Sequence, residues 1–213
     1  MIEYQPMKER PHLYIIPIAH TYADMGSLGD KITVDERYEA TVTGYWVRIF
    51  HYLNSLPADL FAYLQIYQDG LPNTHVEIVD KIINETQTTN YEILRWLKGK
   101  GAVVLGTEDA SLLLEDYRAL QTIVNCPDGE GKPAAYLKYA KTSSLLLEER
   151  DESIAQRIRE TLPVGKTGLL FIGAAHDVGS HLGNEIRVST PEIVSNALTE
   201  VLREFYSLGK ERR

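Results

Sequence analysis

Short apolar runs alternate along this chain with longer segments in which apolar residues recur at three- and four-residue intervals. Runs of four to eight apolar residues, bounded by Gly, Pro and polar clusters, predict buried β-strands. Four segments have this pattern: 13–18, 60–67, 102–105 and 168–172; the short segment 185–188 is a candidate for a fifth strand.

The longer segments predict amphipathic helices that cover the strands. In the segment 33–53, Val34, Tyr38 and Val42 begin a single apolar face, and Pro191 opens a final helix of the same kind. The other helical patterns cover 74–85, 90–98, 110–122 and 134–162. Strands that alternate with helices favour an α/β fold, with a mainly parallel sheet flanked by helices. We expect one domain over residues 1–213, with its site at the carboxyl ends of the strands.

Two segments are loop-like. The residues after His20, TYADMGSLGDK, are rich in Gly, Ser and Asp, and the segment 125–133, NCPDGEGKP, contains two glycines and two prolines. We interpret both as loops, the first at the exit of the first strand.

Composition narrows the class of protein. Of the 213 residues, 44% are hydrophobic, which is enough for a core without disulfides. Cys126 is the single cysteine, which excludes a disulfide framework and a Cys-based zinc site and fits a reducing compartment. No run approaches the ~18 apolar residues of a membrane span, so we expect a cytoplasmic protein without a membrane partner. The net charge is −8 and the basic residues are dispersed, which argues against nucleic-acid binding. The sequence is compatible with a homo-oligomer and does not decide the oligomeric state.

Two histidines follow predicted strands directly. His176 comes after an apolar strand and the small residues Gly173, Ala174 and Ala175, and His20 comes after the strand 13–18 and Ala19. If the two strands are neighbours in a parallel sheet, both imidazoles reach one cleft. The alternative is that each histidine only caps a strand or bonds to a nearby carbonyl.

A charged pair begins the predicted helical face around 149–162. Asp151 lies on the same face as Leu147 and Ile154, and Arg150 lies at its edge. A carboxylate on an apolar face needs a partner, because an unpaired buried charge is costly. Either the two groups form a structural Arg–Asp pair, or both point into the site, where Arg150 binds an anion and Asp151 orients a histidine.

These motifs resemble those of the superfamily that includes the TraB/Tiki-like, ChaN-like and erythromycin-esterase-like proteins. The late segment, ERDESIAQRIRETL followed by GLLFIGAAHDVG, is similar to a charged helix start and a strand ending in Gly-x-x-His. The early segment is similar in order: a strand ending at His20, a loop containing Ser27, a helix, and a second strand ending at Asp69. Pro17 stands in place of the first Gly of the early motif, and Gln68-Asp69 in place of the expected glutamate.

The resemblance implies several activities: metal-dependent peptidase for Tiki-like proteins, ester hydrolysis with His and Glu for esterase-like proteins, and haem binding for ChaN-like proteins. Two histidines with carboxylates suit either an activated water on a divalent metal or a metal-free histidine base. We therefore expect a hydrolase-like enzyme for a small molecule or peptide, with a non-catalytic binding protein for haem or a small anion as the alternative. The predicted catalytic residues are His20, Asp69, Asp151 and His176; the predicted substrate-binding residues are Tyr67, Gln68 and Arg150; the predicted metal ligands are His20, Asp69 and His176.

Overall fold

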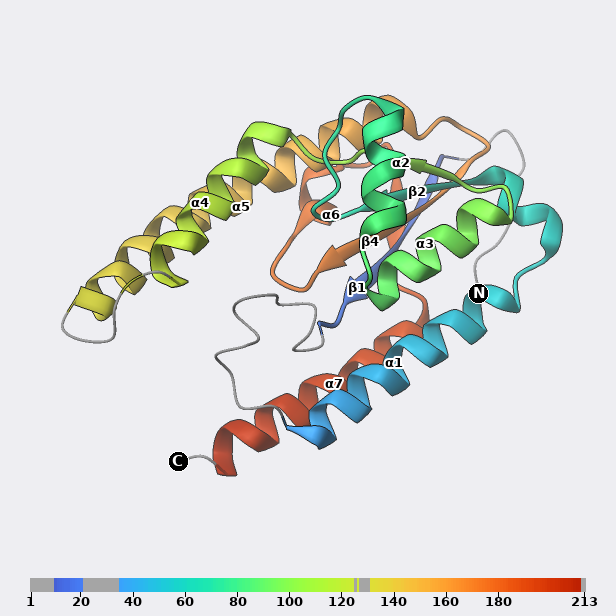
Figure 1. Cartoon of the computed structure of the whole chain (residues 1–213). Helices are drawn as coiled ribbons and strands as arrows, with labels where there is room; N and C mark the ends of the chain where they lie inside the picture. Colours follow the sequence, from blue (N-terminus) through green and yellow to red (C-terminus); the bar gives the residue numbers. More distant parts are fainter. Residues whose placement is uncertain (1–9, 21–34, 125, 127–130, 212–213) are drawn as a thin grey trace.

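One five-stranded, fully parallel sheet organises the protein (Figure 1). The computed structural model describes residues 10–20, 35–124, 126 and 131–211. The strands are β1 (His12–Ile18), β2 (Leu64–Gln68), β3 (Val103–Leu105), β4 (Thr167–Gly173) and β5 (Arg187–Ser189), in the order β3-β2-β4-β1-β5. This arrangement confirms the predicted α/β class with a parallel sheet flanked by helices.

Helices fill the connections between the strands. They are α1 (Glu36–Asn54), the 3₁₀ helix η2 (Ala58–Tyr63), α2 (Val76–Glu85), α3 (Thr89–Gly99), α4 (Ala110–Val124), α5 (Gly131–Thr161), α6 (Val178–His181) and α7 (Glu192–Glu211). Figure 1 shows α1 and α7 side by side, and α4 and α5 as an antiparallel hairpin that extends away from the sheet. Among the described residues, none of these helices is long and apolar enough to cross a membrane.

The two faces of the sheet form two hydrophobic clusters, because successive strand residues point to opposite sides. On β4, Leu169 and Phe171 pack in the first cluster with α1, α3 and α7, whereas Leu170 and Ile172 pack in the second. The second cluster also contains residues of α5, of α6 and of the C-cap of α6: Ile154, Ala155, Ile158, Val178 and Leu182. The strand β4 is therefore buried on both faces, as its continuous apolar sequence predicts.

The strand order opens a crevice at the carboxyl edge of β4. The chain leaves β1 for α1, which lies on the face of the first cluster, and leaves β4 for α6, which lies on the face of the second. Neighbouring parallel strands whose connections leave in opposite directions form the usual ligand crevice of open α/β sheets. The residues after β1, β2 and β4 meet at this crevice.

The second strand is shorter than its apolar pattern predicts. The prediction of a strand over 60–67 is wrong in its first half, because residues up to Tyr63 form η2 and the strand starts at Leu64. Leu60 and Phe61 are buried in the first cluster, and the Phe61 ring packs edge-on against Trp96. The apolar residues before Leu64 thus serve packing in a helical turn, a role that the pattern does not separate from a strand.

The helix ends refine the other predictions. Asp35 caps α1 by accepting from the backbone N–H groups of Arg37 and Tyr38, so the described helix starts later than the predicted residue 33. The predicted loop 125–133 is helical from Gly131 onward, and residues 125 and 127–130 lie outside the described residues. The predicted loop after His20, including Ser27, also lies outside them.

Candidate functional site

A cavity of about 560 Å³ lies at the carboxyl edge of the sheet, where β1, β2 and β4 end. Its lining includes four residues predicted from the sequence: His20, Asp69, Arg150 and His176. The remaining lining comes from the α4–α5 hairpin, from the last residue of β4 and from the turn after it: Asp116, Tyr139, Ser143, Ser144, Leu147, Gly173, Ala174 and Ala175. The helical hairpin therefore forms one wall of the cavity that the predicted site residues line.

His176 is held by a buried carboxylate from α5. The Nδ1 atom of His176 lies 2.5 Å from Oδ1 of Asp151, and the second oxygen of Asp151 accepts from the backbone N–H of Asp177 at 2.8 Å. Asp151 is 3% exposed, so this pair is shielded from water. The prediction that Asp151 lies on the buried helix face is confirmed, and its partner is the histidine rather than Arg150.

Asp69, at the end of β2, reaches the other side of the imidazole. Its Oδ2 accepts from the backbone N–H of Gly173 at 2.9 Å and lies 3.6 Å from Nε2 of His176. This contact is possible because β4 lies beside β2, which brings the ends of two strands about 100 residues apart in sequence together. Three of the four predicted catalytic residues, Asp69, Asp151 and His176, are thus in one cluster.

Arg150 binds three carboxylates of the chain itself. Its Nε and Nη2 bind Glu108 at 2.7 and 3.0 Å, its Nη2 binds Asp69 at 2.9 Å, and its Nη1 binds Asp116 at 2.9 Å. Glu108 is 1% exposed and also accepts from the backbone N–H of Gly70 at 2.6 Å. This network joins the ends of β2 and β3 to the helical hairpin. All three nitrogens of the guanidinium thus already bind carboxylates of the chain. An anion-binding role for Arg150 stays a prediction.

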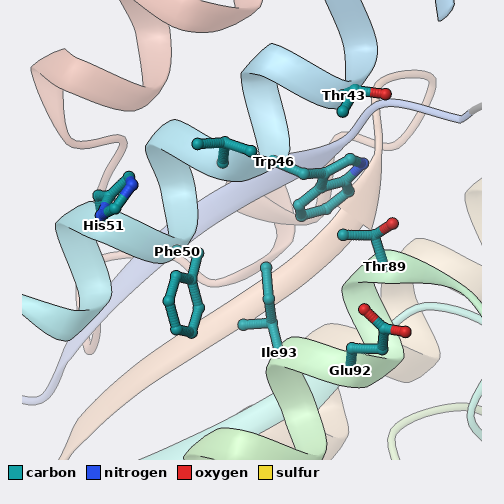
Figure 2. A pocket seen from close by; sticks show the side chains of 8 residues that line it. Thr43, Trp46, Phe50, His51, Thr89, Glu92 and Ile93 are labelled. Atoms are coloured by element: carbon teal, nitrogen blue, oxygen red, sulfur yellow. The ribbon is translucent and has the colours of Figure 1, made fainter.

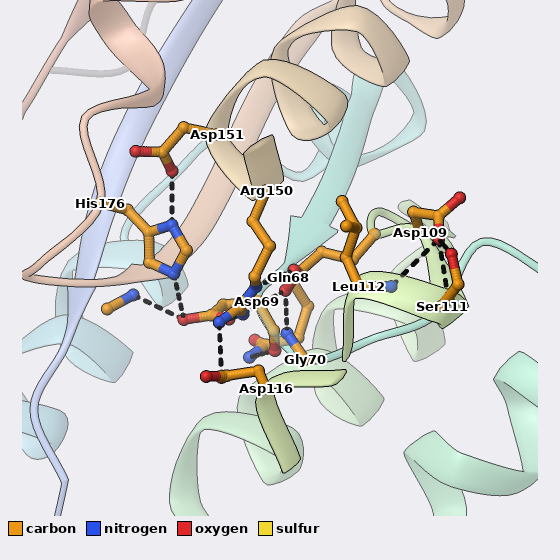
Figure 3. Close-up of polar contacts among 12 residues, drawn as sticks. Gln68, Asp69, Gly70, Asp109, Ser111, Leu112, Asp116, Arg150, Asp151 and His176 are labelled. Atoms are coloured by element: carbon orange, nitrogen blue, oxygen red, sulfur yellow. Dashed lines mark hydrogen bonds and ion pairs between the residues drawn. The ribbon is translucent and has the colours of Figure 1, made fainter. Parts of the chain in front are cut away.

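Figure 3 shows the resulting row of charges: Asp151, His176, Asp69, Arg150 and Asp116 follow one another with alternating sign. Each carboxylate within the row is therefore next to a cationic or protonatable group. Such a row holds its side chains in fixed orientations, because hydrogen bonds and ion pairs link each group to its neighbours.

The row shifts the protonation of its members. Burial alone would lower the pKa of His176, but the hydrogen bond to Asp151 and the charges of Asp69 and Asp151 outweigh it, so this pKa is raised above 6.5. Burial alone would raise the pKa of Asp69, yet the charge of His176 and contacts with Glu108 and Arg150 hold it below 3.8. Burial raises the pKa of Glu108, an effect that Arg150 opposes. Shifted groups in a cavity are typical of functional sites.

His20 lines the same cavity but contacts the row through no hydrogen bond or ion pair among the described residues. Its backbone is held by α1: Tyr38 Oη donates to the carbonyl of His20 at 3.2 Å, and Trp46 Nε1 donates to that of Ala19 at 2.9 Å. Tyr45 Oη donates in the same way to the carbonyl of Pro17 at 2.5 Å. The first helix therefore fixes the exit of β1.

Tyr67 and Gln68, both predicted to bind substrate, are not among the residues that line the cavity. Tyr67 is fully buried, and its hydroxyl bonds to Thr161 at 3.0 Å. Gln68 is 1% exposed, and its Nε2 donates to the carbonyl of Asp69 at 2.8 Å. The structure places both side chains in the interior, because they belong to the buried end of a central strand rather than to the loop beyond it.

The predicted metal ligands do not form a complete metal site. Both oxygens of Asp69 already bind donors, Arg150 and the backbone of Gly173, and His20 is not tied to the other two ligands. Over the described residues, no group of three or more His, Cys, Asp or Glu side chains is arranged to hold a metal ion. A divalent metal stays a prediction, and the chemistry below is derived from the side chains alone.

A second cavity, of about 440 Å³, lies between α1 and α3 (Figure 2). Trp46, Val47, Phe50 and Ile93 make its apolar lining, and the exposed residues His51 and Glu92 also line it. The side chains that form the charged row do not reach it. The cavity at the carboxyl edge is therefore the stronger candidate for chemistry.

No protein-family model, curated protein or solved structure matches this chain. The arguments on function accordingly rest on the geometry of the site.

Sequence reasoning missed two carboxylates and the hairpin wall. Glu108 follows β3 after Gly106 and Thr107; its place beyond a strand end is visible in the sequence, but it was not chosen as a site residue. Asp116 and Tyr139 lie in the middle of helices, where nothing local distinguishes them from exposed positions. Their role depends on how the hairpin packs over the sheet.

Proposed function

We propose that this chain is a hydrolase-like enzyme that acts on a small molecule or a peptide, with His176 as its general base. The observation that supports this most strongly is the Asp151–His176 pair, buried on one side and lining a cavity on the other. A histidine whose Nδ1 binds a carboxylate is fixed in orientation and has Nε2 available for proton transfer.

The chemistry follows from these positions. With the Nδ1 proton directed at Asp151, Nε2 takes a proton from a water molecule while the water oxygen attacks the carbonyl carbon of the substrate. Asp69, at 3.6 Å from Nε2, stabilises the imidazolium that forms. When the tetrahedral intermediate collapses, the bond to the leaving group breaks and His176 returns the proton to it. His20, on the same cavity, is the proposed contact for the leaving group.

The resemblance to the TraB/Tiki-like, ChaN-like and erythromycin-esterase-like superfamily belongs to this proposal. Its late motif supplies Arg150, Asp151 and His176, and in the structure these three side chains belong to one row. The hydrogen bond between Asp151 and His176 joins the helix part of this motif to its strand part, and this contact supports the resemblance.

Turnover by matched histidine variants tests the proposal. Purified protein is assayed on p-nitrophenyl acetate, p-nitrophenyl butyrate and aminoacyl p-nitroanilides, with EDTA and with added Zn²⁺ or Mn²⁺. His176→Ala is expected to lose activity, whereas His181→Ala is expected to retain it, since His181 is partly exposed and lies outside the cavity lining. Full activity of His176→Ala would contradict the assignment.

The same proteins address the alternative of a haem- or anion-binding protein. That alternative predicts no turnover and a visible absorption band, or thermal stabilisation by an anion, that His176→Ala removes. The excess of carboxylates around the cavity disfavours an anionic ligand.

A further inference from the structure

The charges around the carboxyl-edge cavity do not balance. Four carboxylates belong to the network: Asp69, Glu108, Asp116 and Asp151. Two groups offset them, Arg150 and His176, and His176 only when it is protonated. The network stays negative even when Glu108 also holds a proton, and no lysine is among the described residues that line the cavity.

The excess charge is accessible from the cavity at Asp116. This carboxylate gives Oδ2 to Arg150, and no hydrogen bond of Oδ1 is found among the described residues. Its side chain is 22% exposed, against 1% for Glu108 and 4% for Asp151. The fourth carboxylate, Asp69, also lines the cavity and is 16% exposed, but Arg150 and the backbone N–H of Gly173 already bind both of its oxygens. A ligand that enters the cavity therefore meets the second oxygen of Asp116, whereas Glu108 and Asp151 are covered.

Tyr139 and Ser144 line the same cavity as Asp116. Burial and the negative charge of Asp116 raise the pKa of Tyr139, and the positive charge of Arg150 opposes them. An aromatic ring and a carboxylate in one cavity are a typical receptor for an organic cation, because the ring face and the carboxylate both attract positive charge.

We propose that the cavity selects a substrate that carries a protonated amine, with Asp116 and Tyr139 binding the amine and His176 acting on the bond to be hydrolysed. The inference rests on the proposed function for the hydrolytic step. The binding of the cation, however, depends on the hairpin wall rather than on His176. Asp116 is accordingly a specificity-determining residue.

Three probes of matched shape test the binding of the cation: benzylammonium, benzyl alcohol and benzoate. We expect benzylammonium to raise the melting temperature and to shift backbone NMR signals at Ala174 and Ser144, and benzoate to do neither. Asp116→Asn keeps an oxygen for Arg150 but removes the charge, so it should weaken benzylammonium binding about tenfold. The control Glu92→Gln makes the same change beside the second cavity and should leave binding unchanged.

Several results would overturn this inference. Benzoate that binds as tightly as benzylammonium, or Asp116→Asn with unchanged affinity, removes its basis. A loss of binding in Glu92→Gln would place the cation between α1 and α3 instead. If Zn²⁺ binds in an Asp116-dependent manner and benzylammonium does not, the excess charge serves a metal and the amine proposal fails.

Turnover separates this inference from the hydrolase assignment. Protonated 2-(dimethylamino)ethyl acetate and its uncharged isostere 3-methylbutyl acetate differ in charge at nearly equal shape. A preference for the cationic ester that Asp116→Asn abolishes supports both proposals. Benzylammonium binding without hydrolysis of any ester retains the substrate class and refutes the hydrolase. Hydrolysis with equal kcat/KM for the two esters supports the hydrolase assignment and refutes the proposed substrate class.

Discussion

Replacing Arg150 by methionine should destabilise the protein in a strongly pH-dependent way. Arg150 is 9% exposed, and its guanidinium makes four hydrogen bonds to Glu108, Asp69 and Asp116. Methionine keeps much of the side-chain volume but leaves three carboxylates together without a cation. Breaking a buried ion pair from one side costs about 3–5 kcal/mol. A domain of ordinary stability has about 5–15 kcal/mol in total, so a large part of it would be lost.

The pH dependence comes from Glu108. Burial and the charge of Asp69 already raise the pKa of this carboxyl, and Arg150 opposes them. Without Arg150 the folded-state pKa rises further above its unfolded value. Proton binding then stabilises the folded variant below that pKa, and the stabilisation is lost as pH rises through it. The loss of unfolding free energy caused by Arg150→Met should therefore be larger near pH 8 than near pH 5.

Urea unfolding followed by far-UV circular dichroism measures both values. Arg150→Met with Glu108→Gln should recover part of the loss at the higher pH, because the buried charge is gone. The control is Arg48→Met, which removes an exposed bidentate contact with Glu200 and should have a smaller, pH-independent effect. If Arg150→Met lowers the free energy of unfolding no more than the control does, or by the same amount at both pH values, the network does not stabilise the protein as argued.

Three further changes test the site and its support. Asp151→Asn removes the negative charge that raises the pKa of His176, so the rise of kcat/KM with pH should move to lower pH while kcat falls about 10²-fold; pH–rate profiles measure both. Trp46→Phe leaves the buried carbonyl at the end of β1 without its donor and should cost about 1–3 kcal/mol in urea unfolding, beyond its loss of packing. Gly106→Ala places a methyl group 2.8 Å from Cα of Asn73 and should cost about 1–3 kcal/mol in the same assay.

Each of these changes has a matched comparison. Trp96→Phe removes the same volume from a half-buried ring for which no hydrogen bond is found among the described residues, so it should cost less than Trp46→Phe. Gly44→Ala meets no atom within 4 Å in the middle of α1 and should stabilise the protein by about 0.5–1 kcal/mol. A pH–rate profile unchanged by Asp151→Asn would remove Asp151 from the mechanism.

Much of the fold could be predicted from local patterns. The strand before His176 is continuous in apolar residues because β4 is buried on both faces, and such a run is visible without a structure. Asp151 was identified because helical spacing places it between Leu147 and Ile154, and a carboxylate there demands a partner. The error at residues 60–63 has the same origin, since an apolar run records burial and not backbone conformation.

The sequence by itself determined the class of fold, the histidine after β4 and the buried carboxylate that faces it, because these depend on periodicity and on neighbours along the chain. Only the tertiary structure decided which groups meet. The insertion of β4 between β2 and β1 brings Asp69 to His176, and the packing of the hairpin brings Asp116 to Arg150. Strand order and helix packing depend on contacts between distant residues, so no local pattern records them.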